Sequence, residues 1–355
     1  MNGSPRPGVI ERYREFLPVG EATPNLTIGE GDTPMVRAAS LERRLGVAEV
    51  WLKLEGCNPT GSFKDRGLAV AAAKAIEEGS HSFICASTGN TAASAAAFGA
   101  RSGTPTGVII PARGVALGKV AQALIYGARV IPIQGSFDDG LAVVRELAAR
   151  PGVALVNSVN PYRLEGQQTA AFEVVDTLGD APDELYIPVG NAGNITAYWM
   201  GFCAYQRAGR ARQLPVMRGY QAAGAAPIVG GEPVESPDTV ASAIRIGNPA
   251  NWERAVQARD ESDGTIEAVS DELIVEAYQL LAAEEGIFVE LASAASVAGL
   301  LHRARGGEVM GDRVVCVLTG TGLKDPGAAV RYAPKPAEVE ASISAVAGAL
   351  GWSTV

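Results

Sequence analysis

The sequence predicts an α/β protein of two lobes, each an open, mostly parallel sheet covered by helices, with a cleft between the lobes. Two observations predict this fold class. Short runs rich in Val, Ile and Leu alternate with helical stretches, which is typical of parallel sheets buried on both faces. The chain also has 355 residues, and single cores stop growing near roughly 250–300 residues, so two lobes are expected.

The predicted elements alternate regularly along the chain. Strands are expected at 82–87, 106–111, 128–135, 153–157, 184–190 and 313–320, and helices at 91–101, 116–126, 137–150, 163–178 and 194–208. The extended first forty residues and a Gly/Pro-rich excursion at 222–249 break the pattern. Long loops of this kind usually cap a site or a subunit contact. We expect a small domain at 60–155 and a large domain made of 1–59 and 156–355.

Composition excludes several classes of function. The net charge of −9 argues against a nucleic-acid or anionic-membrane partner. No apolar run reaches membrane-spanning length, and the N-terminus lacks the hydrophobic core of a signal peptide. The four cysteines are widely spaced without a CxxC pair, which agrees with a reducing cytoplasm. The two histidines, His81 and His302, lie near the ends of predicted elements. We therefore expect no His-rich metal site and no Ser-His-Asp hydrolase.

Polar clusters follow four of the predicted strands. They read STGNTAAS (87–94), NSVNPYRLEGQ (157–167), GNAGNITA (190–197) and TGTGLKDP (319–326). Ligands of open parallel sheets bind beyond the carboxyl ends of the strands. Helix capping accounts for one Ser, Thr or Asn per helix, but not for clusters of four or five. These strand ends are the predicted ligand site.

Two of the segments together indicate pyridoxal phosphate (PLP). Residues 190–194, GNAGN, combine two glycines with a helix start, which makes an anion cradle without basic residues. Lys64 stands at the mouth of an apolar helix, where the dipole disfavours a free cation. It is either an ordinary surface lysine or covalently occupied. A Schiff-base lysine with a phosphate cradle is the minimum set for PLP. Thr319, or alternatively Thr321, would meet the pyridine nitrogen, and Asn90 the ring oxygen.

The chain resembles the β-family of PLP enzymes, with the tryptophan synthase β-like fold (fold type II), and within it the short-form threonine synthases. The resemblance spans nearly the whole chain and rests on GDTP (31–34), LEGCNPTGSFKDRG (54–67), STGNTAAS, NSVNPYRLEGQ, GNAGN, AIRIGNP (243–249) and LTGTGLKDP (318–326). The lysine segment indicates only the β-family. The last four segments in combination favour threonine synthase.

The resemblance implies a cytoplasmic homodimer that converts O-phospho-L-homoserine and water into L-threonine and phosphate. It implies that the cofactor is bound by Lys64, Asn90, Gly190, Asn191, Ala192, Gly193, Asn194 and Thr319. We expect the substrate to be bound by Ser87, Thr88, Thr91, Ser158, Asn160 and Arg163. Arg163 is the candidate for the substrate phosphate because a guanidinium matches phosphate geometry. Lys119 is a weaker candidate, for which an ordinary solvated lysine is an equal alternative.

Two other functions remain open at this point. A serine/threonine dehydratase of the same fold needs no second phosphate site, so Arg163 discriminates against it. A non-catalytic binding protein of the same fold would not need Lys64, so an intact lysine argues against that alternative.

Overall fold

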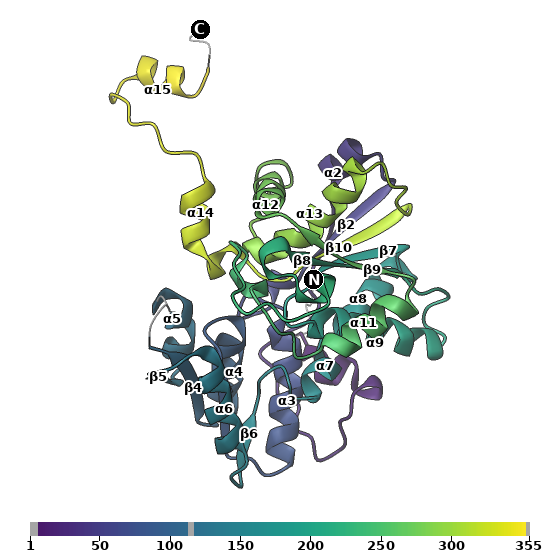
Figure 1. The fold of residues 1–355 in the computed structure, drawn as a ribbon, viewed down its shortest axis with the longest axis vertical. Coiled ribbons are helices and arrows are strands. Elements are labelled where there is room, and N and C mark those ends of the chain that lie inside the picture. The colour runs from purple at the N-terminus through teal and green to yellow at the C-terminus, as the bar shows by residue number, and fades with distance from the viewer. Residues whose placement is uncertain (1–5, 113–116, 353–355) are drawn as a thin grey trace.

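The computed structural model describes residues 6–112 and 117–352, and its strands form two sheets (Figure 1). The six-stranded sheet has the order β1 (Met35–Arg37), β2 (Glu49–Leu54), β10 (Arg313–Leu318), β7 (Glu184–Pro188), β8 (Val216–Ala222), β9 (Thr265–Val269). The four-stranded sheet has the order β5 (Arg129–Ile133), β4 (Thr106–Pro111), β3 (Ser82–Ala86), β6 (Val153–Leu155). Among the described strands every pairing is parallel except β1 with β2.

Helices cover these sheets and join the parallel strands. Their bounds are α1 (Gly8–Arg12), α2 (Ala39–Leu45), α3 (Lys64–Glu77), α4 (Asn90–Ser102), α5 (Leu117–Ile125), α6 (Phe137–Ala148), α7 (Tyr162–Gln167), α8 (Thr169–Leu178), α9 (Gly193–Arg207), α10 (Pro227–Gly230), α11 (Trp252–Glu261), α12 (Asp271–Glu284), α13 (Leu291–Arg305), α14 (Pro326–Tyr332) and α15 (Ile343–Ala349). The predicted fold class, two mostly parallel sheets with helices, is therefore present. All four strands of the smaller sheet fall inside the predicted small domain, whose bounds remain a prediction.

The predicted strands agree with the structure to within a few residues, but four strands were not predicted: β1, β2, β8 and β9. In β8 the polar residues Arg218 and Gln221 interrupt the apolar pattern. Arg218 is compensated by Glu184 on β7 at 2.8 Å, and the Gln221 side-chain oxygen accepts from the Ile228 amide at 2.9 Å. The helix predicted at 163–178 is two helices, α7 and α8, with Gln168 between them.

Close packing of α3 against α7 positions the residues around Lys64. A Cβ on Gly166 of α7 would lie 2.1 Å from the Arg66 carbonyl oxygen, and one on Gly67 of α3 would lie 2.7 Å from the Arg163 carbonyl oxygen. Real Cβ atoms do not approach oxygen so closely, so both positions require glycine. The two glycines bring the start of α3, which carries Lys64, against the start of α7, which carries Arg163.

A buried ion network lies two residues beyond Lys64. Arg66 donates to Glu55 at 2.7 Å and to Glu173 of α8 at 2.6 Å, and Lys53 of β2 donates to Glu173 at 2.7 Å. The two cations and two carboxylates balance, which a buried cluster requires. The network ties β2, α3 and α8 together and so fixes the helix that begins with Lys64.

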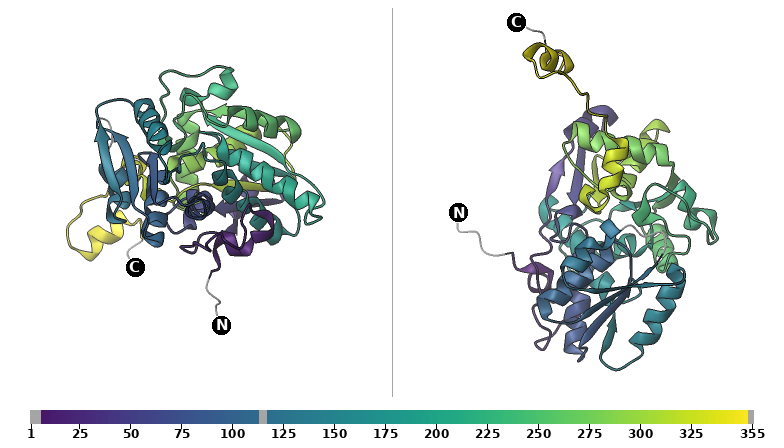
Figure 2. Two further views of the ribbon diagram at one scale, coloured as in Figure 1. Left: turned by 90° about the horizontal axis from the view of Figure 1, so that it is seen from below. Right: turned by 90° about the vertical axis from the view of Figure 1, so that its left-hand side faces the viewer.

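The C-terminal segment leaves the body of the molecule. Helix α14 still packs on the body through the buried Ala328, whereas α15 and the chain before it extend outward in Figure 1, and Figure 2 shows the same segment from two other directions. Ile343 and Trp352 are exposed there. In the described part of the chain, no helix has both the length and the apolar character needed to cross a bilayer.

Candidate active site

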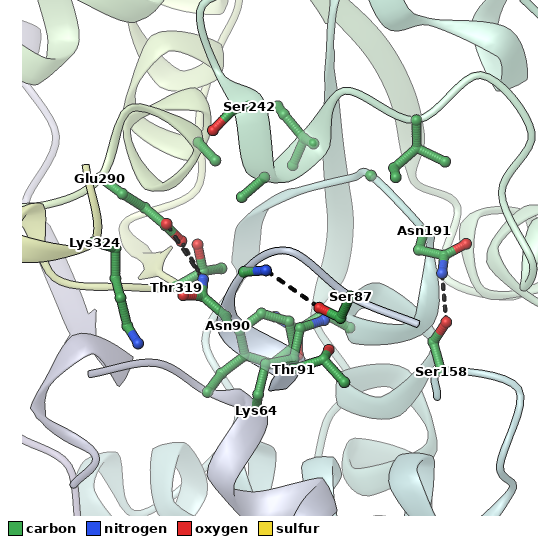
Figure 3. Close-up of a pocket in the computed structure, with 18 of the residues that line it drawn as sticks. Lys64, Ser87, Asn90, Thr91, Ser158, Asn191, Ser242, Glu290, Thr319 and Lys324 are labelled. Atoms are coloured by element: carbon green, nitrogen blue, oxygen red, sulfur yellow. Dashed lines mark hydrogen bonds between the residues drawn. The ribbon is translucent and has the colours of Figure 1, made fainter. Parts of the chain in front are cut away.

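A pocket of about 450 Å³ lies between the two sheets, a size typical of small-molecule sites. Its walls come from both lobes, because residues after β3 and from α5 line it together with residues after β7 and β10. Figure 3 shows Lys64 on one wall, with Glu290 and Lys324 to one side and Asn191 and Ser158 to the other. The excursion at 222–249 contributes 242–246 to the lining, as expected for a long loop that caps a site.

Four helices begin at this pocket. Their first residues, which all line it, are Lys64 (α3), Asn90 (α4), Gly193 (α9) and Leu291 (α13). The first backbone N–H groups of a helix lack partners within the helix, and the helix dipole places partial positive charge there. The pocket is therefore built to hold anions.

Charged side chains add to this potential. The cationic lining residues in the described part of the chain are Lys64, Arg163, Arg245 and Lys324, and the carboxylates are Glu290 and Asp325. An excess of cations in a protein of net charge −9 attracts anionic ligands to this site in particular.

Lys64 has the properties of a nucleophilic amine. Its Nζ lies 4.2 Å from the centre of the Phe63 ring. Burial and the charge of Arg163 together lower the pKa of Lys64 to about 7, against the smaller opposing effect of Glu290. About half of the amine is then neutral near pH 7, and only the neutral form attacks an aldehyde.

The small-lobe wall consists of the predicted segment Ser87, Thr88, Gly89, Asn90 and Thr91. A Cβ on Gly89 would meet no atom within 4 Å. The backbone is thus open to the pocket, beside the first N–H groups of α4. A carboxylate fits this arrangement.

Residues 190–194 form the predicted cradle on the opposite wall, and all five line the pocket. Ala192 has φ of 62°, the left-handed region, and Gly190 is required because a Cβ there would lie 2.8 Å from the Ile244 Cα. Asn194 is buried, and both polar atoms of its side chain lack a partner among the described residues. Since unpaired buried amides are costly, an anion bound at the start of α9 would complete the site.

The Asn191 side chain is already engaged. Its nitrogen donates to Ser158 Oγ at 2.5 Å, and its oxygen accepts from the Ala250 amide at 2.6 Å. Figure 3 shows the bond to Ser158. It joins the predicted cofactor loop directly to the predicted substrate segment. Only the backbone of Asn191 remains for a phosphate.

Arg163 is fully buried and lines the pocket. One guanidinium nitrogen donates to the Val156 carbonyl at 2.8 Å, whereas Nε and Nη2 have no partner among the described residues. Burial lowers the pKa of Arg163 to about 10, so it remains a cation at neutral pH. The two unpaired nitrogens of this buried cation are therefore placed to donate hydrogen bonds to an anionic ligand.

Asn160 is not among the residues that line the pocket, so its substrate contact stays a prediction. Its nitrogen donates to the Leu155 carbonyl at 2.9 Å and its oxygen accepts from the Tyr162 amide at 3.0 Å, so the side chain caps the start of α7. Asn157 lines the pocket instead, held by the Ala86 backbone at 2.9 Å and 2.8 Å. The α5 side chain of Lys119 is outside the described residues.

Thr319, and not Thr321, lines the pocket. The Thr319 hydroxyl lies 2.9 Å from Ser293 Oγ, and its carbonyl accepts from the Phe63 amide at 3.0 Å. The Thr321 side chain packs on Gly61, with its methyl carbon 2.8 Å from where a Cβ on Gly61 would lie. This geometry supports Thr319 as the predicted partner of a pyridine nitrogen.

Sequence reasoning missed Glu290, Lys324 and Gln122. Lys324 Nζ donates to Gln122 Oε1 of α5 at 2.6 Å, which bridges the two lobes at the pocket. Lys324 stood in the quoted TGTGLKDP segment, so a search of that segment for cations would have found it. No sequence pattern marked Glu290 or Gln122 as a site residue, because each resembles an ordinary polar residue of a helix.

Together these residues fit PLP: an amine with lowered pKa, a phosphate cradle with an unpaired amide, and a hydroxyl for the ring nitrogen. A family model described as "Pyridoxal-phosphate dependent enzyme" matches residues 26–320. This chain belongs to that family. Its cofactor is therefore PLP, as predicted.

Known proteins agree with this family. The chain is 57% identical to the threonine synthase of Synechocystis sp. over 97% of its own length and 91% of that protein. It is 53% identical to the threonine synthase of Mycobacterium tuberculosis over 98% of its own length and 97% of that protein. The solved structure of processed threonine deaminase isoform 2 from Solanum lycopersicum matches with a TM-score of 0.73 at 23% identity, covering 84% of this chain and 86% of that one. The predicted fold is confirmed by this likeness.

Proposed function

We propose that this protein is a threonine synthase that converts O-phospho-L-homoserine and water into L-threonine and phosphate. The observation that carries the proposal is Arg163, a buried cation with two unused nitrogens beside Lys64. The cofactor phosphate has its own cradle at 190–194. Arg163 therefore forms a second anion site, which the phosphate of the substrate would occupy. The relatives named above, which are threonine synthases at 53% and 57% identity, support the same reaction.

Each end of the substrate has a counterpart in the pocket. Arg163 and Ser158 bind its phosphate, because desolvating a dianion without a cation would be costly. The start of α4, with Ser87, Thr88 and Thr91, binds its carboxylate. The two anchors stretch the substrate across the pocket and hold its carbon chain near Lys64.

PLP, when bound, supplies the electron sink that lets protons leave carbon. Lys64, Asn90, Thr319 and residues 190–194 would hold it. Thr319 offers a hydroxyl rather than a carboxylate, which leaves the pyridine nitrogen unprotonated.

The reaction needs protons moved at three carbons. The Cα proton and one Cβ proton must be removed, the Cγ–oxygen bond breaks as phosphate leaves, Cγ gains a proton, the oxygen of water adds at Cβ, and Cα regains a proton. Lys64 is the base and acid for these transfers, because its pKa of about 7 lets the amine take and return protons at neutral pH. Neither histidine lines the pocket.

The test is a comparison of products from one preparation of holoenzyme. We expect phosphate and threonine from O-phospho-L-homoserine, and little keto acid from serine or threonine. Keto acid from serine or threonine without phosphate release would identify a dehydratase instead. Bound PLP with neither product would identify a binding protein.

The remaining parts of the proposal concern assembly and place. We propose a homodimer in the cytoplasm, with a small domain at 60–155 that closes on the rest of the chain. The exposed apolar residues of the C-terminal segment, among them Ile343 and Trp352, support contact with a second copy. Light scattering coupled to size exclusion tests the dimer, and a monomer at working concentration contradicts it.

A further inference from the structure

Glu290 occupies the N-cap position of α13 without capping it. Its backbone is extended, and its side chain accepts no bond from the helix. By contrast, Ser270 caps α12 by accepting from the Leu273 amide at 3.3 Å. Acidic N-cap residues ordinarily accept from the first turn of their own helix. The Glu290 carboxylate turns into the pocket instead.

This carboxylate makes a hydrogen bond across the cleft. Asn90 Nδ2, at the start of α4 in the small lobe, lies 3.1 Å from one Glu290 oxygen and 3.3 Å from the other. Figure 3 shows the contact. An ionised carboxylate only accepts hydrogen bonds, so it selects the amide nitrogen of Asn90 and not the amide oxygen. The amide nitrogen carries two hydrogens, and one of them remains for a second acceptor in the pocket.

Glu290 is anchored to the turn that carries Thr319. Its amide donates to the Gly320 carbonyl at 3.1 Å, and a Cβ on Gly320 would lie 2.5 Å from its carboxylate oxygen. Ser293 completes the turn by accepting from the Gly320 amide at 2.8 Å and contacting the Thr319 hydroxyl at 2.9 Å. One rigid turn therefore holds both Thr319 and the partner of Asn90.

The charged groups that face Glu290 are Lys64, Lys324 and Asp325. Burial raises the pKa of Glu290 overall and Asp325 adds to this, while the Asn90 bond, Lys324 and Lys64 lower it. The Asn90 bond and the two lysines thus oppose protonation of the carboxylate.

We propose that Glu290 is a positioning residue, which holds the Asn90 amide nitrogen toward the ring oxygen of PLP and ties the two lobes across the pocket. The proposal rests on the PLP chemistry of the family and not on the identity of the substrate. Its failure would therefore leave the proposed reaction untouched.

Glu290→Gln is the first variant, because glutamine has the same shape but can donate as well as accept. The Asn90 amide is then free to turn. Loss of one charge-assisted hydrogen bond predicts a PLP dissociation constant about 10- to 150-fold higher when apoenzyme is titrated with PLP. The visible absorbance of bound PLP, which depends on the ring oxygen, should change its pH midpoint. Glu232→Gln, at an exposed residue of the same lobe, should change neither property.

A double variant separates positioning from a merely structural role. In the Asn90→Ala background, Glu290→Gln should raise the PLP dissociation constant no further, because the group through which it acts is gone. Gly320→Ala moves the carboxylate without altering its chemistry, and should reproduce the loss of PLP affinity.

Three results would overturn the proposal. One is an unchanged PLP affinity and absorbance in Glu290→Gln. Another is an additive loss in the double variant. A third is a Gly320→Ala protein that binds PLP as the parent does.

Discussion

Replacing Arg163 with methionine tests the second anion site. The side chain is fully buried, one of its nitrogens is bonded to the Val156 carbonyl, and Nε and Nη2 are unused within the described residues. Methionine fills much of the same volume without charge. The change removes the proposed ligand of the substrate phosphate and leaves the cradle at 190–194 intact.

The magnitude follows from the number of bonds lost. One charge-assisted hydrogen bond is worth about 1.5–3 kcal/mol, so kcat/KM should fall by about tenfold to several hundredfold, and further if both free nitrogens bind. The apoprotein should become more stable to unfolding, or its stability should stay the same. A buried cation without a carboxylate partner is unfavourable in the unliganded protein, so its removal is neutral or stabilising.

The assay measures three quantities on each variant: bound PLP, phosphate release from O-phospho-L-homoserine, and thermal unfolding of the apoprotein. PLP content should remain near that of the parent. Arg212→Met, at a side chain that is 89% exposed, is the matched control and should change none of the three. Loss of PLP in Arg163→Met would show that the two phosphate sites are exchanged, and unchanged turnover would refute the substrate site.

Four further predictions concern Lys64, Thr319 and Arg66. The rate at which apoenzyme takes up PLP should rise as pH increases through about 7, because the neutral amine of Lys64 then becomes the major form. A midpoint near 10.5, the pKa of a free lysine, would contradict this. Lys64→Ala should lose the visible absorbance of bound PLP altogether. Thr319→Asp should protonate the pyridine nitrogen and divert turnover to side products, an effect that Thr321→Asp should lack; the reverse result would exchange the two roles. Arg66→Met should lower the free energy of unfolding by about 3–5 kcal/mol in denaturant titrations, because Glu55 and Glu173 lose their shared cation. Arg37→Met, at an arginine whose side chain is 41% exposed, should lower it by less than about 1 kcal/mol.

The sequence predicted those strands that occur as short runs rich in Val, Ile and Leu, whether they are buried, as most of β7 and β10 are, or partly exposed, as β5 is. The run at 106–111 is β4 to the residue, because its side chains are apolar or small throughout. β8 was not predicted because Arg218 and Gln221 are polar, and their hydrogen-bond partners come from β7 and from α10. Such pairings are tertiary, so local composition does not show them.

The same distinction explains which site residues were predicted. Lys64 and residues 190–194 stand out because their local chemistry is unusual for a helix start. Asn160 was predicted as a ligand because a polar residue beside a strand end serves equally well as a ligand or as a helix cap, and in the structure its side chain accepts from the first amide of α7. Glu290 was missed because its role depends on Asn90, 200 residues away in the chain and across the cleft.

The most direct test of the proposed reaction is to trace the oxygen of water into the two products. In water enriched in ¹⁸O, the proposed reaction breaks the Cγ–oxygen bond and adds the oxygen of water at Cβ. Mass spectrometry should therefore find one solvent oxygen in the hydroxyl of threonine and none in the phosphate released at early times. Solvent oxygen in the phosphate, with homoserine as the organic product, would mean that the phosphorus–oxygen bond is cleaved by simple hydrolysis, and would contradict the account.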